Sequence, residues 1–399
     1  MKSLKYLLLT LLGLLICPNL FARDINLDEI YIKSSSSYIK KLRWSKLDTY
    51  KKIDAQCIER DVIFSEWSSG GDIVYIKEKS NINRIYKYQL RSKRSIEICS
   101  IKGIITIARI TNNGRYLILK RLKQKGGVIP RGERIIIDLQ TKIITKEESA
   151  SSFLDFSIIA GGDSIIYEDG AGFIELIPDS GVKRLLVKES DYSDIALSNN
   201  PSIAYISPDK QKTLVINGSG GRYSAIVLYG DSSININGIT SSTEVFWINN
   251  HEFVMRRGSP GYYSVELYNI NLRKMTTLLR ESFNTNITFS AHPRILSFLK
   301  EGIVKLFFIN IKKLISPGIE GEDISFSPDG RRFTSLFYKR LYIVNLSNIE
   351  KRQIELKRSW KSILLIYRDL KGRTEEFENE YSLRYIHRKI EVYQQLLGM

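Results

Sequence analysis

A unit of about forty residues that recurs along the chain limits the possible folds more than any other feature. Each copy reads as an apolar strand, a tight turn, a second apolar strand, an aromatic-rich third strand and a last strand. The clearest copy runs from Asp323 to Leu346 and turns at residues 327–330. Four such strands form a small twisted sheet with two apolar faces, and one sheet alone cannot bury both. The copies must therefore stack against one another.

The turns of seven copies give a register for the repeat. Successive turn markers lie 37 to 48 residues apart, at Gly70, Asn113, Gly161, Asp209, Asn250, His292 and Asp329. This spacing, with four short strands per unit, is typical of a β-propeller. We predict an all-β fold, a β-propeller of seven blades with a C-terminal amphipathic helix. Eight blades are the alternative, if the N-terminal pieces and residues 362–367 build a further sheet.

Two of the turns carry a family resemblance. Residues Ser327, Pro328, Asp329 and Gly330 resemble the repeat of the TolB/PD40 family of WD40-like propellers, and Ser207, Pro208 and Asp209 resemble its first three positions. The resemblance covers residues 62–357 and implies an envelope propeller that binds proteins. TolB itself has an α/β domain before its propeller, and residues 23–60 are too short for one. The resemblance is therefore to the propeller without that domain.

The N-terminus has the pattern of a secretory signal peptide. Lys2 and Lys5 precede an apolar run, and Ala22 stands before the first charged residues of the following segment. We predict that residues 1–22 are a signal peptide cleaved after Ala22, which indicates export to the periplasm. An uncleaved anchor and a lipoprotein attached at Cys17 are the alternatives, and Ile16 before this cysteine fits lipid attachment poorly.

The rest of the chain divides into three predicted segments. Residues 23–61 supply N-terminal strands that close the propeller, residues 62–358 form the propeller, and residues 359–399 form a C-terminal strand/helix extension. In the first segment, residues 29–32 and 51–57 are predicted strands around a turn at 34–37. We expect the second of them to pair with the last blade.

The chain end changes periodicity. From Glu375 onward, apolar residues recur mostly at intervals of three or four, which predicts a helix with one apolar face. These residues are Phe377, Tyr381, Tyr385, Ile386, Ile390, Tyr393 and Leu397. The helix either docks on its own propeller or is offered to a groove in a partner.

The charge of the chain narrows the choice of partners. Its formal net charge is +17. In an exported protein this points to an anionic lipid surface or a cell-wall polymer, in addition to envelope proteins, unless it serves only solubility. No nucleic-acid-binding motif occurs, so nucleic acid is not a predicted partner.

No catalytic, cofactor-binding or metal-binding residues are predicted. The chain lacks a Gly-x-Ser-x-Gly motif, its three histidines are scattered, and the pairs Gly126-Gly127 and Gly220-Gly221 are not followed by the Lys-Ser/Thr of a phosphate loop. The seven turn residues named above receive a structural role only. The prediction is an exported, TolB-like protein-binding scaffold. The alternatives are a scaffold like an outer-membrane protein assembly factor, or a carbohydrate-active propeller enzyme with acids converging in its channel.

Two cysteines, Cys57 and Cys99, remain after the predicted cleavage and lie about one repeat apart. In the register above they occupy equivalent outer strands of adjacent blades. Outer positions of neighbouring blades are expected to be farther apart than the limit of about 7 Å between disulfide-linked Cα atoms. We therefore predict two free thiols, packed as small apolar residues between blades.

Overall fold

The computed structural model describes most of the chain from residue 27 onward. The described residues are 27–33, 36–111, 114–123, 131–148, 156–158, 164–168, 172–191, 202–219, 222–230, 232–236, 245–259, 262–281, 288–290, 294–300, 302–321, 323–377 and 379–398. The predicted signal peptide with Cys17, the markers Asn113, Gly161 and His292, and both glycine pairs lie outside them.

The described strands form seven four-stranded antiparallel sheets, so the predicted seven-bladed β-propeller is confirmed. In all but the last sheet, consecutive strands of the chain pair in order.

Blade 1 contains β2 (Val62–Trp67), β3 (Ile73–Lys79), β4 (Ile82–Gln89) and β5 (Arg94–Lys102). Blade 2 contains β6 (Ile104–Ile110), β7 (Tyr116–Lys123), β8 (Arg131–Asp138) and β9 (Ile144–Glu148); blade 3 contains β10 (Phe156–Ile158), β11 (Ile165–Glu168), β12 (Gly172–Ile177) and β13 (Val182–Lys188). Blade 4 contains β14 (Ser202–Ile206), β15 (Lys212–Ser219), β16 (Arg222–Tyr229) and β17 (Ser232–Ile236); blade 5 contains β18 (Val245–Asn249), β19 (Glu252–Ser259), β20 (Tyr262–Asn269) and β21 (Lys274–Glu281). Blade 6 contains β22 (Thr288–Ser290), β23 (Ile295–Lys300), β24 (Ile303–Phe308) and β25 (Lys313–Ile315).

Blade 7 combines the two ends of the chain. Its strands β26 (Asp323–Phe326), β27 (Arg332–Phe337) and β28 (Arg340–Asn345) come from the last repeat. Its outer strand is β1 (Gln56–Arg60), which pairs antiparallel with β28 from Gln56 opposite Ile343 to Arg60 opposite Arg340. An N-terminal strand therefore closes the last blade as we expected, but it begins at Gln56 and not at Lys51.

By its internal contacts the chain divides into two compact units. Unit 1 consists of Met1–Ser65, Tyr75–Glu78 and Thr285–Met399, and its described residues include blades 6 and 7 and all five α-helices. Unit 2 consists of Glu66–Val74 and Lys79–Asn284 and includes blades 2 to 5.

Within unit 2, the blades bury their apolar faces against each other. One cluster joins Ile118 of blade 2 to Leu176 of blade 3. The next joins Phe173 of blade 3 to Val215 of blade 4, and blade 4 is joined to Trp247 of blade 5 by a third cluster. This face-to-face burial is the reason why the period of the repeat predicts the fold.

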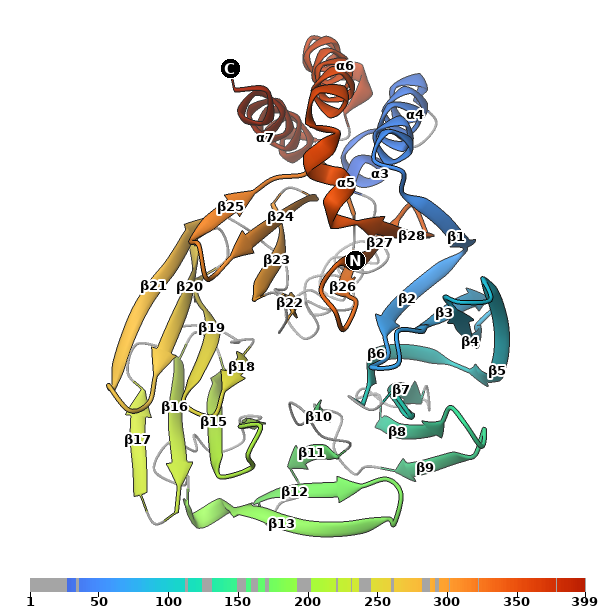
Figure 1. Ribbon diagram of the computed structural model, residues 1–399. Coiled ribbons are helices and arrows are strands. Elements are labelled where there is room, and N and C mark those ends of the chain that lie inside the picture. Colours follow the sequence, from blue (N-terminus) through green and yellow to red (C-terminus); the bar gives the residue numbers. More distant parts are fainter. Residues whose placement is uncertain are drawn as a thin grey trace, which may run out of the picture. The chain divides into compact units, whose positions relative to one another are not determined.

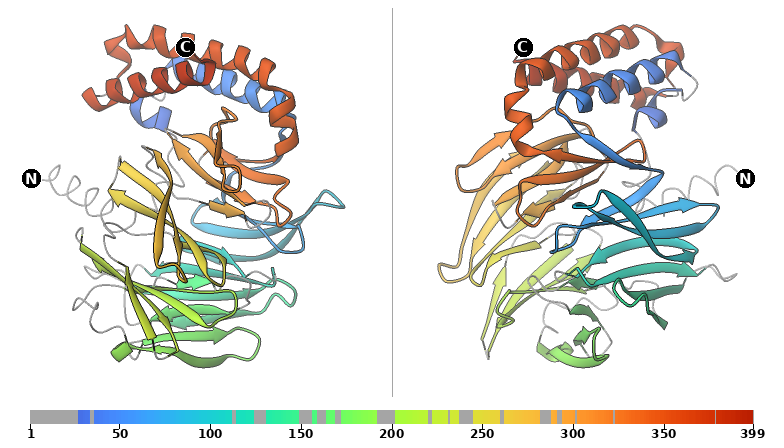
Figure 2. Two further views of the ribbon diagram at one scale, coloured as in Figure 1. Left: turned by 60° about the vertical axis from the view of Figure 1, so that its left-hand side comes forward. Right: turned by 45° about the vertical axis from the view of Figure 1, so that its right-hand side comes forward.

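Five α-helices of the described residues lie outside the blades (Figure 1). They are α3 (Leu27–Tyr31), α4 (Ser37–Lys52), α5 (Leu346–Lys351), α6 (Gln353–Lys371) and α7 (Glu380–Leu397); short 3₁₀ turns occupy Glu189–Asp191 (η1) and Thr374–Glu376 (η2). Figure 2 shows α4, α6 and α7 side by side as a layer beside blades 6 and 7, and we call these three the helix layer. No described helix combines the length and the apolar character needed to cross a membrane.

Two predicted strands are wrong and a third is displaced, and the eight-bladed alternative is wrong as well. Residues 29–32 fall largely in α3, residues 51 and 52 end α4, and residues 362–367 lie inside α6. In α6 the apolar run is one part of a longer helical period, because the residues buried along it are spaced by three or four: Leu356, Trp360, Ile363, Leu364, Tyr367 and Leu370. In the predicted turn, Ser36 is instead the N-cap of α4, and its side chain accepts a hydrogen bond from the Tyr38 backbone.

The predicted C-terminal helix is present as α7, and it packs on its own molecule. It begins at Glu380, after the cap residue Asn379, and it packs against α6 and α3. Tyr385, Ile386 and Tyr393 belong to one apolar cluster with blades 6 and 7. Tyr381, which we placed on the apolar face, is 69% exposed.

Candidate functional site

The predicted turn of blade 7 is a closed hydrogen-bonded loop between β26 and β27. The Ser327 hydroxyl donates to Asp329 Oδ1 at 2.6 Å and accepts from the Arg332 backbone at 3.0 Å. Asp329 Oδ1 also accepts from the Arg331 backbone at 3.0 Å. Gly330 has φ +61°, a left-handed conformation that favours glycine. Pro328 is exposed at the tip.

The turn of blade 4, between β14 and β15, repeats these contacts with a different fourth residue. The Ser207 hydroxyl donates to Asp209 Oδ1 at 2.6 Å and accepts from the Lys212 backbone at 3.0 Å. Lys210 has φ +60°, nearly the value of its counterpart Gly330. Its ammonium lies 2.8 Å from Oε1 of the buried Glu175 in blade 3. The lysine therefore joins the turn to the neighbouring blade. Pro208, like Pro328, is exposed at the tip.

A hollow of about 660 Å³ opens beside the blade 7 turn. Its apolar lining includes Ile295 and Phe308 of blade 6. Its polar lining includes Asp329, Arg331 and Arg332. The hydrogen bond from Ser327, together with the two nearby guanidinium groups, lowers the pKa of Asp329 and keeps it ionised. An apolar wall beside fixed charges of both signs suits an amphipathic peptide segment.

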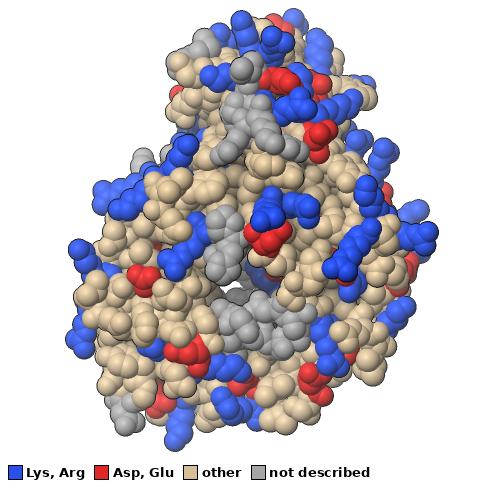
Figure 3. Space-filling model, viewed as in Figure 1, with Lys and Arg blue, Asp and Glu red and all other residues tan. Residues whose placement is uncertain are grey.

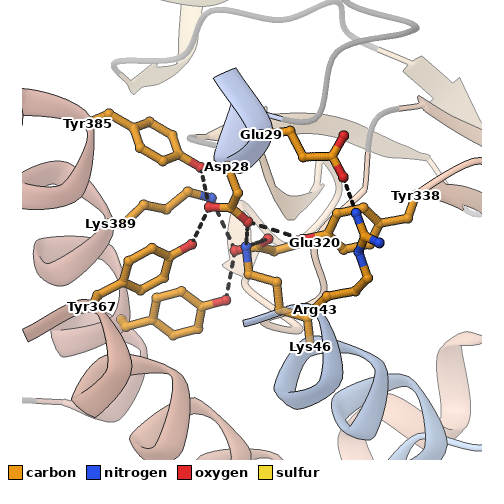
Figure 4. Close-up of polar contacts among 10 residues, drawn as sticks. Asp28, Glu29, Arg43, Lys46, Glu320, Tyr338, Tyr367, Tyr385 and Lys389 are labelled. Carbon is orange, nitrogen blue, oxygen red and sulfur yellow. Dashed lines mark hydrogen bonds and ion pairs between the residues drawn. The ribbon is translucent and has the colours of Figure 1, made fainter. Parts of the chain in front are cut away.

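Beneath the helix layer, eight side chains form what we call the buried cluster (Figure 4). They come from segments far apart in the sequence: Asp28 of α3, Lys46 of α4, Glu320 before β26, Tyr338 between β27 and β28, Tyr367 of α6, and Tyr385, Lys389 and Tyr393 of α7. The two carboxylates and the two ammonium groups balance in formal charge. Each of these four residues is at most 7% exposed.

Asp28 is one of the two anionic centres of the buried cluster. Its carboxylate accepts hydrogen bonds from the hydroxyls of Tyr367 at 2.8 Å, Tyr385 at 2.9 Å and Tyr338 at 3.3 Å, and it pairs with Lys46. Burial alone would raise its pKa. The ammonium groups of Lys46 and Lys389 outweigh that effect and lower the pKa of Asp28 to about 2.

Glu320 is the second anionic centre. Its Oε1 accepts from Lys389 at 3.0 Å and from Tyr393 at 2.8 Å, and the carboxylate also pairs with Lys46. The backbone carbonyl of Glu320 accepts a hydrogen bond from the Tyr50 hydroxyl. Lys46 thus bridges both carboxylates. Burial alone would lower the pKa of Lys46, but the two carboxylates outweigh burial and raise it.

A glycine allows α6 to approach the segment that carries Glu320. Gly318 has φ +68°, and a Cβ atom at this position would lie only 2.1 Å from the Trp360 ring. No residue with a side chain fits there without moving α6. The close approach brings the loop between β25 and β26 beneath the helix layer.

The buried cluster joins elements that are far apart in the sequence. Its lysines, tyrosines and carboxylates are groups that catalyse proton transfer elsewhere, but here they contact one another, and all of them except the partly buried Tyr338 are closed to solvent. Removing one charge would leave its partner buried and uncompensated, which costs about 3–5 kcal/mol. The cluster therefore fastens α3 and the helix layer to the blades of unit 1. Among the described residues, no group of three or more His, Cys, Asp or Glu side chains is placed to hold a metal ion.

The sequence analysis identified the turns but missed the buried cluster. One signal was present: Lys389 lies within the apolar stripe of α7, four residues from both Tyr385 and Tyr393. A lysine in such a stripe indicates a buried partner of opposite charge. Nothing near Asp28 or Glu320 in the sequence identifies either residue as that partner.

No protein-family model and no curated protein matches the chain. Among solved structures, the chain is similar to hydrazine synthase of Kuenenia stuttgartiensis, at 11% identity and a TM-score of 0.53, covering 71% of this chain and 95% of that one. It is also similar to the tricorn protease, at 12% identity and a TM-score of 0.50, covering 84% of this chain and 37% of that one. TolB from Acinetobacter baumannii matches at 14% identity and a TM-score of 0.38, over 57% of this chain and 56% of that one. The first two likenesses concern the propeller fold alone.

Proposed function

We propose that this protein is an exported scaffold of the cell envelope that binds a protein partner at the hollow beside the blade 7 turn. The observation that carries the proposal is the hollow itself, with its apolar lining and the charged groups Asp329, Arg331 and Arg332. The turn at its edge keeps its shape without a ligand, because Ser327 and Asp329 satisfy the backbone of the loop. A preformed site loses little conformational entropy on binding.

Three further points support this proposal. The N-terminal pattern from Lys2 to Ala22 favours export to the periplasm. The turn residues resemble those of envelope propellers that bind proteins. Loops presented by a rigid scaffold are a common place for binding residues.

A photo-crosslinking amino acid at Pro328 tests the proposal in intact cells. Pro328 is exposed at the tip of the turn, next to the hollow. We expect one discrete adduct with an envelope protein, which Arg331→Glu weakens because the charge at the hollow is reversed. Lys339, exposed in the hairpin at the opposite end of the same blade, is the matched control position. The same adducts from both positions, or adducts insensitive to Arg331→Glu, would contradict the proposal.

A further inference from the structure

We infer that the outer face of α4 and α6 docks on an anionic lipid bilayer. Two large apolar side chains on these helices are exposed: Trp44 of α4 is 70% exposed and Leu365 of α6 is 55% exposed. The other three tryptophans, Trp67, Trp247 and Trp360, are at most 7% exposed. Packing of the core gives no reason why Trp44, on a helix that packs into the fold, is exposed.

The hydrogen bonds between the helices place these two side chains together. Tyr38 near the start of α4 donates to Asp369 near the end of α6 at 2.5 Å, and Ser359 near the start of α6 donates to Asp48 near the end of α4 at 3.3 Å. The helices are therefore antiparallel, and in this register Trp44 and Leu365 fall at the same level. The buried residues of both helices face the blades, so the two exposed side chains share the opposite face.

Positive charge surrounds this apolar pair. Eight exposed cations lie on the same two helices, and none of them forms an ion pair within the described residues: Lys40, Lys41, Lys51, Lys357, Arg358, Lys361, Arg368 and Lys371. The exposed acids of these helices are already engaged, because Asp48 pairs with Lys52 at 2.9 Å and Asp369 accepts from Tyr38. Figure 3 shows Lys and Arg side chains along the upper edge, over the helices.

This chemistry matches a lipid surface better than a protein or a cell-wall polymer. Tryptophan prefers the bilayer interface, and an exposed leucine gains by entering the acyl region. Each lysine or arginine near an anionic surface adds to the attraction, so the exposed cations on these two helices raise the membrane affinity of the apolar pair. A polysaccharide surface would attract the cations, but it offers no apolar environment that the exposed leucine could enter. The hollow of the proposed function lies elsewhere, so failure of either proposal leaves the other standing.

Co-sedimentation of the leaderless protein with vesicles tests the inference. We expect binding to phosphatidylcholine vesicles that contain phosphatidylglycerol and at least about tenfold weaker binding to phosphatidylcholine alone, because only the former attract the cations. Tryptophan emission should shift to the blue on binding, and lipids brominated on the acyl chain should quench it. Trp44→Phe should abolish the quenching while leaving the sedimentation largely intact. Sedimentation without quenching in the wild-type protein would mean that another face binds and would overturn the inference.

Charge variants make the test specific to this face. Lys40→Glu with Lys361→Glu should weaken vesicle binding at least about tenfold. Lys79→Glu with Lys274→Glu changes the net charge equally at exposed positions on blades 1 and 5 and should have little effect. Equal losses in the two double variants would show a non-specific charge effect and overturn the inference. Retention on purified peptidoglycan with no vesicle binding would also overturn it, in favour of a cell-wall polymer.

Discussion

The blades and the helix layer are stabilised in different ways. Most strands of a blade are consecutive in the chain, and the described turns of blades 4 and 7 are closed by neighbours in sequence, as Ser327 and Asp329 close the blade 7 turn. The helix layer is fastened by charges from distant segments, as Asp28 of α3 meets Tyr385 of α7. Local patterns therefore reveal blades, whereas an attachment through long-range ion pairs leaves little trace in the sequence. The predictions below test this contrast.

The largest expected effect is at the centre of the buried cluster. Asp28→Ala leaves Lys46 without one of its two carboxylates, and it should lower the free energy of unfolding of unit 1 by about 3–5 kcal/mol. Chemical denaturation measures this loss. Glu29→Gln on the same helix is the matched control, because Glu29 pairs with Arg43 while both side chains remain over 40% exposed, and it should cost less than about 1 kcal/mol.

A charge-balanced double variant separates the loss of charge from the loss of packing. Asp28→Asn with Lys389→Met keeps the cluster neutral, since Lys46 can still pair with Glu320. Its cost should be clearly smaller than the sum of the two single costs. Additive costs would show that the side chains act independently and that the cluster is not one network.

The turn of blade 7 should show a smaller, local effect. Gly330→Val places a β-branched residue at φ +61° and should cost about 1–3 kcal/mol. Gly330→Asn should cost less than about 1 kcal/mol, because asparagine tolerates this conformation and Lys210 adopts it in blade 4. Equal melting temperatures for the wild-type protein and Gly330→Val would show that a side chain at residue 330 does not strain the backbone there.

The blades and the helix layer also differ in how far their structure can be predicted from the sequence. The blade number, the turns and the closing strand follow from a period that repeats along the chain. The buried cluster does not, because Asp28 and Glu320 stand in unremarkable surroundings and acquire their role only when α3 and the loop before β26 meet. The two misassigned strands, at residues 29–32 and 362–367, fail for a related reason. A short apolar run fits a strand and a buried helix equally well, and only a longer window, as in α6, distinguishes them.

Acid should weaken the attachment of the helix layer to the blades, because the Asp28 carboxylate becomes protonated. The pKa of Asp28 is lowered to about 2, so its contribution is present above the unfolded value of about 3.9 and is lost as the pH falls through about 2. The full loss, reached below both pKa values, amounts to about 2–3 kcal/mol. Unfolding free energies between pH 5 and pH 2 should therefore fall more steeply for the wild-type protein than for Asp28→Asn. Parallel curves would show that this carboxylate is not stabilised by its lysines.

The smallest expected effect concerns the cysteines. Cys57 on β1 and Cys99 on β5 are free and lie on the outer strands of blades 7 and 1, although Cys57 is exposed and not packed between blades as we expected. Burial raises the pKa of both thiols, and that of Cys99 reaches about 11, so the more exposed Cys57 should react several-fold faster in the native protein. Timed labelling measures both rates, and unfolded, non-reduced mature protein should yield two thiols. An intramolecular bridge would contradict the strand register.

Hydrogen exchange tests the central claim, that the helix layer and blades 6 and 7 form one body joined through the buried cluster. In the wild-type protein, amides of α4, α6 and α7 should exchange together with those of β27 and β28, at the rate set by opening of the whole unit. In Asp28→Ala the helix amides should exchange faster while β27 and β28 keep more of their protection. Helices that already exchange independently in the wild-type protein, or an Asp28→Ala variant with unchanged helix protection, would contradict the account.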